Sequence, residues 1–405
     1  MLEIRGEAVE GFEPVREAFA RNFREHGELG AAFALYLRGR KVVDLWAGDA
    51  RPEVGGRPAP AVAWSADTAQ VLRSVTKGAV AGAALLLAQR GELDLDAPVA
   101  SYWPEFKAAG KDRIPVRWLL SHRAGLPALD RPLTVDQVLS WEPAVAAVAA
   151  QAPFWEPGRA HGYHPYTYGW LVGEVVRRVT GRTVGRYFAE EIAGPLGLDL
   201  WIGLPAGLGD RVGRLVDLPA PPPGPGLRLR PKRSVSDAYQ DPASLTARSF
   251  GAVRPGLDLN DPAAQAAEIP GANGIGTARA VARYYAALIG AGDGPAARPL
   301  LTPAMLAEAM GPASDGPDRV LIVNSRFGHG FFRHGPTSPM TSPAAFGHPG
   351  RGGALGFADP ELGLGFGYVT CGMQPGVTGD IRSRTLIEAV RSCLLPASGT
   401  ARTPG

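Results

Sequence analysis

Apolar side chains near the start of the chain recur every four residues, at Val15, Phe19 and Phe23. Positions four apart share one face of a helix, so this pattern predicts a helix over residues 11–26. Residues 30–50 are rich in strand-forming side chains and are interrupted by Arg38-Gly39-Arg40, which predicts two strands joined by a turn. We therefore expect the N-terminal part to be a helix followed by an antiparallel hairpin.

A second hairpin is predicted over residues 354–373, with its turn at Asp359-Pro360-Glu361. In its second strand, glycines on one face alternate with large apolar side chains on the other. The glycines are Gly363, Gly365 and Gly367. A helix can approach a face of glycines closely, and the segment 379–395 is the expected partner.

Between these two ends the pattern is mainly helical. Residues 74–90 are largely apolar and end at Gly91, and helical spacing returns from Ala278 to Leu288. The proline-rich stretch 219–233 is expected to be an extended connection. Strands at both ends with helices between them indicate the fold class α/β, in its mixed α+β form. We expect an antiparallel sheet flanked by helices, with an inserted mainly helical region.

The pattern predicts a single unit over residues 1–396. Its α/β part would take about 1–70 and 290–396 and its helical part about 71–289, with a cleft between them. The last residues, 397–405, are expected to be a disordered tail.

Composition limits the classes of function. The chain has 405 residues and a formal net charge of +3, and its arginines are scattered, so we expect no nucleic-acid partner. The N-terminal segment lacks the pattern of a signal peptide and no apolar run reaches a spanning length, which favours a cytoplasmic protein without a membrane partner. The two cysteines, Cys371 and Cys393, predict neither a disulfide framework nor a zinc site. The sequence indicates no cofactor and leaves the oligomeric state open.

Ser74 and Lys77 stand three residues apart where the apolar helix begins. Residues at this spacing lie on one helix face, so the lysine amine can reach the serine hydroxyl. A serine becomes a nucleophile when a base takes its proton, and a lysine is such a base when burial lowers its pKa. The alternative is that Ser74 only caps the helix, and the short pattern alone does not exclude it.

Three further motifs follow in order along the chain. They are "LLSHRAGLP" (119–127), "PGRAHGYHPYTYGWLVGEVVRRVTG" (157–181) and "FGHPGRGGALGFADPELGLGFGYV" (346–369). Together with "SVTK" at 74–77, they make the chain resemble the serine β-lactamase-like superfamily from about residue 30 to 395. Within it, the chain is most similar to the class C β-lactamase-related esterases, called family VIII carboxylesterases. The resemblance implies a β-lactamase/transpeptidase-like fold and one acyl-transfer site.

The resemblance also implies a role for each matching residue. Ser74 matches the nucleophile, Lys77 its proton acceptor and Tyr163 the tyrosine that relays protons. His348-Pro349-Gly350 matches the strand motif that borders the nucleophile. The backbone N–H near Arg351 would be the second oxyanion donor, beside that of Ser74.

The neighbouring side chains have alternative roles. Tyr166 is the second candidate for the relay tyrosine; otherwise it lines the pocket and packs against Trp170, four residues along a helix. His348 is expected to bind the substrate or to support the site from behind. His122 is expected to be structural and to close a loop by hydrogen bonds. His329 and His334 lack a carboxylate or histidine partner at metal-ligand spacing, so we expect no metal site.

Replacements in two motifs separate the chain from β-lactamases. Those enzymes carry an asparagine two residues after the relay tyrosine, where this chain has Pro165. They also carry Lys-Thr where this chain has His348 and Pro349. A proline cannot make the amide contact and a histidine is not a fixed cation, so efficient β-lactam hydrolysis is not expected. A small-molecule ester with little charge near the scissile bond fits these replacements better.

The predicted function is therefore a serine esterase that works through a Ser74 acyl-enzyme. An acyltransferase or cyclising thioesterase of secondary metabolism would use the same intermediate with another acceptor, and the sequence does not separate the two. A β-lactamase and a non-catalytic binding protein rank below these hypotheses.

Overall fold

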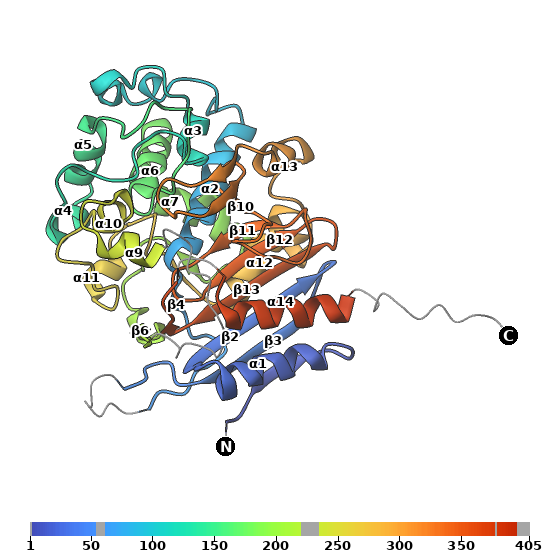
Figure 1. The fold of residues 1–405 in the computed structure, drawn as a ribbon. Helices are drawn as coiled ribbons and strands as arrows, with labels where there is room; N and C mark the ends of the chain where they lie inside the picture. Colours follow the sequence, from blue (N-terminus) through green and yellow to red (C-terminus); the bar gives the residue numbers. More distant parts are fainter. Residues whose placement is uncertain (1, 54–60, 220–234, 377–378, 395–405) are drawn as a thin grey trace.

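The computed structural model describes residues 2–53, 61–219, 235–376 and 379–394 (Figure 1). Its centre is a nine-stranded sheet in the order β1-β3-β2-β13-β12-β11-β10-β9-β8. Neighbouring strands are antiparallel throughout. The strands are β1 (Arg5–Ala8), β2 (Gly30–Leu37), β3 (Arg40–Gly48), β8 (Ser314–Pro317), β9 (Asn324–Phe327), β10 (Phe332–Arg333), β11 (Phe346–Pro349), β12 (Leu355–Asp359) and β13 (Leu364–Thr370). The prediction of one antiparallel sheet built from both ends of the chain is confirmed.

Both predicted hairpins are present in this sheet. Arg38 and Gly39 join β2 to β3 with φ angles of 47° and 85°, in the left-handed region that tight turns use. After β12, the Asp359 carboxylate accepts the backbone N–H of Glu361 at 3.1 Å and that of Leu362 at 3.2 Å. β2 pairs along its whole length with β13, which joins the two hairpins into one sheet.

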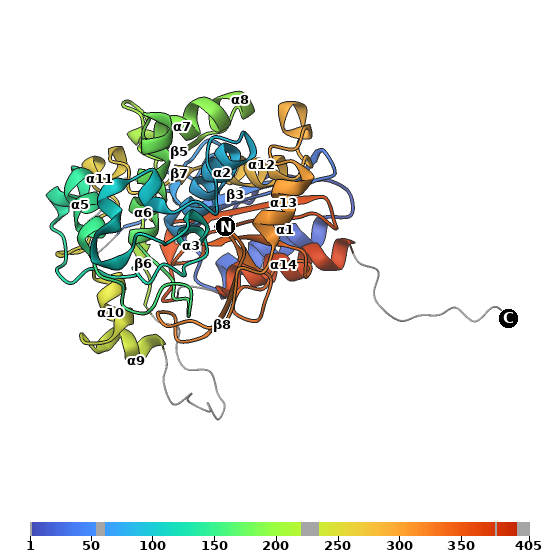
Figure 2. The same ribbon diagram turned by 90° about the horizontal axis from the view of Figure 1, so that it is seen from above.

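Helices cover both faces of the sheet, but one helix lies on the opposite face from that predicted. α1 (Glu13–Glu25) and α14 (Ile381–Leu394) lie side by side on one face, where Phe19 and Leu386 share a core with Phe366 (Figures 1 and 2). The glycine face of β13 instead meets α12 (Ala278–Leu288): a Cβ on Gly365 would lie 2.4 Å from the Ala282 carbonyl oxygen. Assigning helix 379–395 to the glycine face was therefore wrong. Alternation shows that a strand has two faces, but it does not say which helix covers each.

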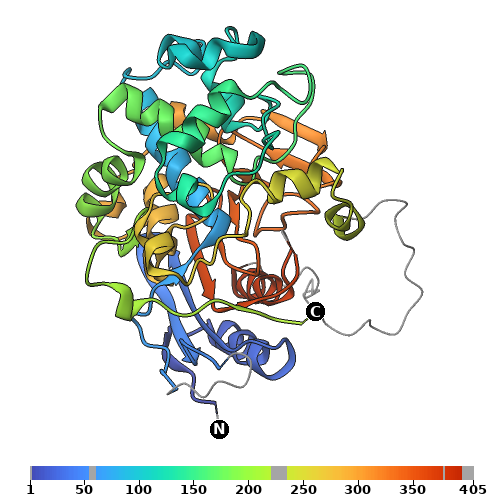
Figure 3. The same ribbon diagram turned by 90° about the vertical axis from the view of Figure 1, so that its left-hand side faces the viewer.

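The inserted helical part lies beside the sheet (Figure 3). Its longer helices are α2 (Thr76–Gln89), α5 (Glu142–Ala150) and α6 (Thr167–Thr180). Short helices complete it: α3 (Val116–Leu120), α4 (Val135–Leu139), α7 (Val184–Phe188), α8 (Gly194–Leu196), α9 (Val235–Gln240), α10 (Leu245–Phe250) and α11 (Pro262–Ala266). α13 (Pro303–Met310) precedes β8. The short 3₁₀ segments are η1 (Arg73–Val75), η2 (Val99–Ser101), η3 (Pro104–Gly110), η5 (Gly209–Arg211) and η6 (Gly294–Ala297), and η4 (Ala189–Ala193) is a π-helical turn. α2 is buried on every side from Thr76 to Leu87, which accounts for its nearly continuous apolar sequence.

Small strands join the helical part together. β4 (Gln70–Val71), β7 (Ile275–Gly276) and β5 (Leu200–Trp201) form a three-stranded antiparallel sheet just before η1. β6 (Val216–Asp217) pairs in parallel with β14 (Gly372–Met373). The sequence pattern did not reveal these strands because each contains only two residues.

Some predictions fall outside the described residues or cross an expected boundary. Residues 220–233 of the proline-rich stretch and the predicted tail 397–405 lie outside the described part of the chain. α12 lies within the range expected for the helical part, yet it packs on the sheet. None of the helices in the described ranges has the length and apolar character needed to cross a membrane.

Candidate active site

Ser74 lies on η1, the single turn that connects β4 to the buried helix α2. Its hydroxyl does not cap a helix, because neither η1 nor α2 has a side-chain cap at its N-terminus. The preceding residue, Arg73, has a φ of 53°, a conformation that non-glycine residues rarely adopt. The helix-cap alternative for Ser74 is therefore excluded, and the half-buried hydroxyl remains available for chemistry.

Lys77 lies one turn further along, in the first turn of α2, and is completely buried. Its Nζ lies 2.7 Å from the Pro165 carbonyl oxygen, 2.5 Å from that of Gly271 and 3.3 Å from Ser74 Oγ. Burial lowers the Lys77 pKa well below its usual value, and the positive charge of Arg73 lowers it further. A neutral amine has two N–H groups and one lone pair. With the two carbonyls accepting the N–H groups, the lone pair is left for the Ser74 hydroxyl.

Tyr163 brings a phenol to the same point. Its ring centroid lies 4.9 Å from Lys77 Nζ, and its backbone N–H donates to the buried Asp318 carboxylate at 3.1 Å. Burial raises the Tyr163 pKa, and a contact with the Ser74 hydroxyl opposes this rise only partly. That contact is not a well-formed hydrogen bond, so the phenol oxygen has no full partner among the described residues. The phenol stays protonated at neutral pH and can donate its proton.

Two neutral histidines fix the loop that carries Tyr163. His122 Nδ1 accepts the backbone N–H of His164 at 3.2 Å, and His164 Nε2 accepts that of Leu126 at 3.0 Å. Burial lowers the pKa of both histidines, to about 3 for His164, which keeps these nitrogens free to accept. His122 therefore makes the loop-closing hydrogen bond expected of it. The next residue of the loop, Pro165, supplies the first carbonyl acceptor of Lys77.

β11 brings the third motif against the nucleophile segment. A Cβ on Gly350 would lie 2.5 Å from the Leu72 carbonyl oxygen, so only glycine lets the two segments approach this closely. His348 is buried, and its Nδ1 lies 2.8 Å from the Pro349 carbonyl oxygen. Burial lowers the His348 pKa well below its usual value, and nearby Lys77 adds to this effect. His348 is thus a neutral imidazole, with its centroid 6.0 Å from that of Tyr163.

The turn after β11 and the nucleophile segment each carry one free backbone N–H group. Gly353 N–H donates to the Gly350 carbonyl oxygen at 3.1 Å, and Gly352 has a φ of 94°, as the third residue of a type II turn requires. The backbone N–H of Arg351, like that of Ser74, has no hydrogen-bond partner among the described residues. These two N–H groups lie on segments that contact each other at Gly350.

Of the two aromatic residues expected to line the pocket, Tyr166 lies partly at the surface and Trp170 lies in the core. Tyr166 is half-buried and stacks on Trp170, with ring centroids 6.3 Å apart and planes 20° apart, as predicted. Trp170 itself is completely buried in the core of the helical part, so it supports Tyr166 and is not exposed to a substrate. Tyr166 immediately precedes α6, whereas Tyr163 lies in the loop before it.

Sequence reasoning missed several groups at this site. Tyr239 of α9 lies beneath the Arg351 guanidinium, 5.5 Å from its central carbon, and it packs on Phe250. Burial raises the Tyr239 pKa, and the positive charges of Arg351 and Arg73 oppose this rise. Tyr239 follows the proline-rich stretch and carries no motif. The carbonyl acceptors of Lys77 carry no side-chain signal either.

The arrangement supplies the parts of a nucleophilic acyl-transfer site. A hydroxyl, a neutral amine and a protonated phenol meet in one place, and two free backbone N–H groups lie alongside. No cluster of three or more metal-ligating side chains occurs in the part of the chain that the structure describes.

Comparison with known proteins agrees with this fold. The profile of the Beta-lactamase family matches residues 16–391. The chain is 37% identical over 378 residues to "Esterase/beta-lactamase LipL" of Mycobacterium tuberculosis (strain ATCC 25618 / H37Rv), covering 90% of this chain and 82% of that protein.

Two solved structures are also similar over nearly their whole length. A family VIII carboxylesterase is 38% identical, with a TM-score of 0.84 over 97% of this chain and 100% of that one. EstA from Arthrobacter nitroguajacolicus Rue61a is 34% identical, with a TM-score of 0.83 over 98% of this chain and 100% of that one. The chain belongs to the beta-lactamase family and is similar to its family VIII carboxylesterase members.

Proposed function

We propose that this protein is a serine hydrolase that cleaves small-molecule carboxylic esters through an acyl-enzyme on Ser74. The observation that carries the proposal is the environment of Lys77, whose amine is buried, held by two carbonyl oxygens and placed 3.3 Å from Ser74 Oγ. A serine is activated where a nearby base is neutral at working pH. The names of the esterase relatives support the same reaction class.

In the first half of the reaction, Lys77 takes the Ser74 proton as Oγ attacks the ester carbonyl. The carbonyl oxygen becomes a tetrahedral oxyanion, and the backbone N–H groups of Ser74 and Arg351 stabilise it. Tyr163 donates its phenolic proton to the departing alkoxide, and Lys77 returns a proton to the phenolate. The alcohol leaves and the acyl group stays on Ser74.

In the second half, water replaces the alcohol. Tyr163 and Lys77 take a proton from the water molecule as it attacks the acyl-enzyme, and Ser74 leaves with a proton from Lys77. The reverse use of the same groups follows from microscopic reversibility. No group in this sequence of steps has to carry a permanent charge, which agrees with the depth at which Lys77 and Tyr163 are buried.

The ester is expected to carry little charge beside the scissile bond. His348 stands where β-lactamases place a lysine, and its depressed pKa makes it neutral, so it cannot pair with a carboxylate there. The half-buried rings of Tyr166, which follows Tyr163 in the chain, and of Tyr239, which lies beside Arg351, favour apolar groups. A short p-nitrophenyl ester should therefore have a much higher kcat/KM than the cephalosporin nitrocefin. Comparable values for the two would make β-lactamase the better assignment.

The nucleophile is tested by mass spectrometry of the intact protein after treatment with a fluorophosphonate. We expect one adduct, located on Ser74 by peptide mapping, and none in a folded Ser74→Ala variant that has also lost ester hydrolysis. Hydrolysis by folded Ser74→Ala at the wild-type rate would end the serine mechanism.

The oxyanion donor is tested by changing one backbone atom. Proline is favoured at the second position of a type II turn, so Arg351→Pro removes the N–H while keeping the turn. Loss of one oxyanion donor typically costs about 10²- to 10³-fold in kcat, and we expect a loss in this range. Arg351→Ala is the matched control, because it removes the guanidinium but keeps the N–H. Equal losses in the two variants would assign the effect to the side chain.

A further inference from the structure

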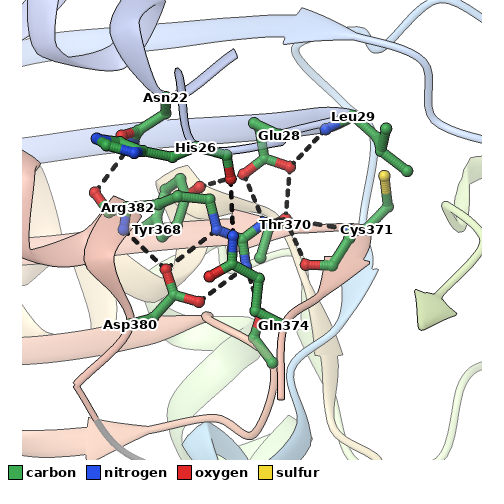
Figure 4. A network of polar contacts seen from close by, with 12 residues as sticks. Asn22, His26, Glu28, Leu29, Tyr368, Thr370, Cys371, Gln374, Asp380 and Arg382 are labelled. Carbon is green, nitrogen blue, oxygen red and sulfur yellow. Dashed lines mark hydrogen bonds and ion pairs between the residues drawn. The ribbon is translucent and has the colours of Figure 1, made fainter. Parts of the chain in front are cut away.

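Arg382, in the first turn of α14, is a completely buried arginine within a network of polar contacts (Figure 4). Its Nη1 lies 3.2 Å from Glu28 Oε2, and its Nη2 lies 2.9 Å from Asp380 Oδ2. Glu28 is itself buried and also accepts hydrogen bonds from Tyr368 and Thr370 of β13. The guanidinium is therefore held in one orientation from several elements of the fold.

One nitrogen of this guanidinium, Nη2, has a second partner besides Asp380. Nη2 also donates to the backbone carbonyl oxygen of Gly352, at 2.5 Å. The turn is shaped to admit it: Gly353 has a φ of 129°, and a Cβ there would lie 2.5 Å from Nη2. Gln374 N–H donates to the same carbonyl oxygen at 3.2 Å.

The Gly352 carbonyl is the first part of a hydrogen-bonded chain that ends at the active site. It shares a peptide group with Gly353 N–H, which donates to the Gly350 carbonyl oxygen at 3.1 Å. That carbonyl in turn shares a trans peptide group with Arg351 N–H, so the N–H points away from the turn. Two peptide dipoles thus lie head to tail between a buried cation and the N–H assigned above as an oxyanion donor.

We propose that Arg382 is a positioning residue for ester hydrolysis, which orients and polarises the Arg351 N–H through the peptide groups of Gly352 and Gly350. A cation at one end of a hydrogen-bonded chain strengthens every donor along it, and this effect is larger where water is excluded. Fixing the donor before the reaction also avoids reorganisation in the transition state. The inference rests on the proposed function, because it needs a carbonyl carbon attacked by Ser74.

A purely structural ion pair is the competing explanation. Buried ion pairs contribute little to stability relative to apolar replacements, because removing the charges from water is costly. A structural role also accounts for the bond from Nη2 to the Gly352 carbonyl, because the N–H groups of a buried guanidinium need acceptors. The two explanations differ in what they predict for catalysis in a variant that is still folded.

The experiment compares Arg382→Gln and the double variant Glu28→Gln/Arg382→Gln with the wild type. The single change leaves both Glu28 and Asp380 without their cation. The double variant also removes the buried Glu28 charge, so that only the Asp380 carboxylate stays charged, and it keeps amides that hydrogen-bond. Thr385→Val is the matched control: the Thr385 hydroxyl bonds to Asn22 at 2.8 Å, next to Arg382, without touching the guanidinium. Circular dichroism and thermal unfolding establish that each protein is folded.

The readout is hydrolysis of a p-nitrophenyl ester and of its thiono analogue, in which sulfur replaces the carbonyl oxygen. Sulfur is a weak hydrogen-bond acceptor, so a thionoester depends less on the oxyanion donors. We expect kcat for the oxygen ester to fall by roughly 10- to 100-fold in the double variant, less than for loss of a whole donor, with little change in KM. The thionoester should lose much less, so the ratio of the two rates shrinks. Thr385→Val should keep the wild-type ratio.

Three outcomes are distinguishable. Labelling of wild-type Ser74 by a fluorophosphonate, together with a smaller oxygen-to-thiono ratio in the double variant, supports the inference. A folded double variant with an unchanged ratio would overturn it and leave Arg382 with a structural role only. Absence of Ser74 labelling in the wild type would overturn the proposed function itself.

Discussion

Lys77 and Lys111 are both buried lysines, but their amines have different partners. Lys111 Nζ donates to three backbone carbonyl oxygens, those of Ala108, Ala149 and Gln151, at 2.7 to 2.9 Å. An ammonium group has three N–H donors, so this site satisfies the charged form completely. Burial lowers the Lys111 pKa only to about 8, and the group stays mostly protonated at neutral pH.

Lys77 has two carbonyl oxygens and, in place of the third, the hydroxyl of Ser74. A hydroxyl can donate as well as accept, so the neutral amine is satisfied here too, with its lone pair toward Ser74. The nearby Arg73 charge further opposes protonation, and the Lys77 pKa falls well below its usual value. The difference shows that burial alone does not make a lysine a base; the third partner of the nitrogen and the neighbouring charge decide its role.

The largest expected effect is the loss of kcat on replacing Lys77, with Lys111 as the comparison. Lys77→Arg and Lys77→Ala should both lower kcat by roughly 10⁴-fold or more, because removing one member of a nucleophile–base pair disables the pair. An arginine stays protonated and cannot accept the serine proton. Lys111→Met should lower the temperature of unfolding, since it leaves three carbonyl oxygens without a donor, but should keep kcat within the wild-type range.

These effects are measured by steady-state kinetics on a p-nitrophenyl ester, together with thermal unfolding of each variant. If folded Lys77→Arg keeps most of the turnover, Lys77 acts as a charge and not as a base. If folded Lys111→Met loses turnover, Lys111 also contributes to catalysis, and the contrast between the two lysines is wrong.

A second expected effect concerns the phenol beside Lys77. Tyr163→Phe removes only the hydroxyl, and loss of a positioned acid or base typically slows turnover by about 10²- to 10⁴-fold. Tyr166→Phe is the matched control, because Tyr166 stacks on Trp170 at the pocket edge and should change kcat little. Kinetics of both variants on one ester decide between them: the reverse ranking would move proton relay to Tyr166.

The sequence predicted the sheet and the side chains of the site more fully than the contacts that tune them. Strand alternation and turn residues were enough for both hairpins, because these signals are local. Ser74, Lys77 and Tyr163 were found because their side chains belong to motifs, and the structure brings them together. Their roles stay predictions until the variants are measured.

The missed contacts come from backbone atoms and from long-range packing. Any residue type could supply the carbonyl oxygen of Gly271, so no sequence signal marks it as a partner of Lys77. Arg382 stands in an ordinary helix, and its meeting with Glu28 joins positions 354 residues apart. The prediction that helix 379–395 covers the glycine face was wrong for the same reason. The alanines of α12 pack against the glycines of β13, and the sequence of neither segment alone shows this.

The smallest expected effect is in the pH dependence of stability. A lysine that is neutral when folded and charged when unfolded binds a proton on unfolding, so the free energy of unfolding rises with pH between its folded and unfolded pKa values. The slope is about 1.4 kcal/mol per pH unit for one proton. For Lys77 this window opens well below the usual lysine pKa, whereas for Lys111 it opens near its pKa of about 8. The stability that each neutral amine retains is lost as pH falls through its window.

Urea unfolding of wild type, Lys77→Met and Lys111→Met at several pH values measures this pH dependence of the free energy of unfolding. We expect the difference between wild type and Lys77→Met to begin rising at a lower pH than the difference for Lys111→Met, because Lys77 is completely buried and also faces the charge of Arg73. A Lys77 difference that begins to rise no earlier than the Lys111 difference would mean that the Lys77 amine is protonated in the folded protein at neutral pH, and the base assigned to Ser74 would have to be sought elsewhere.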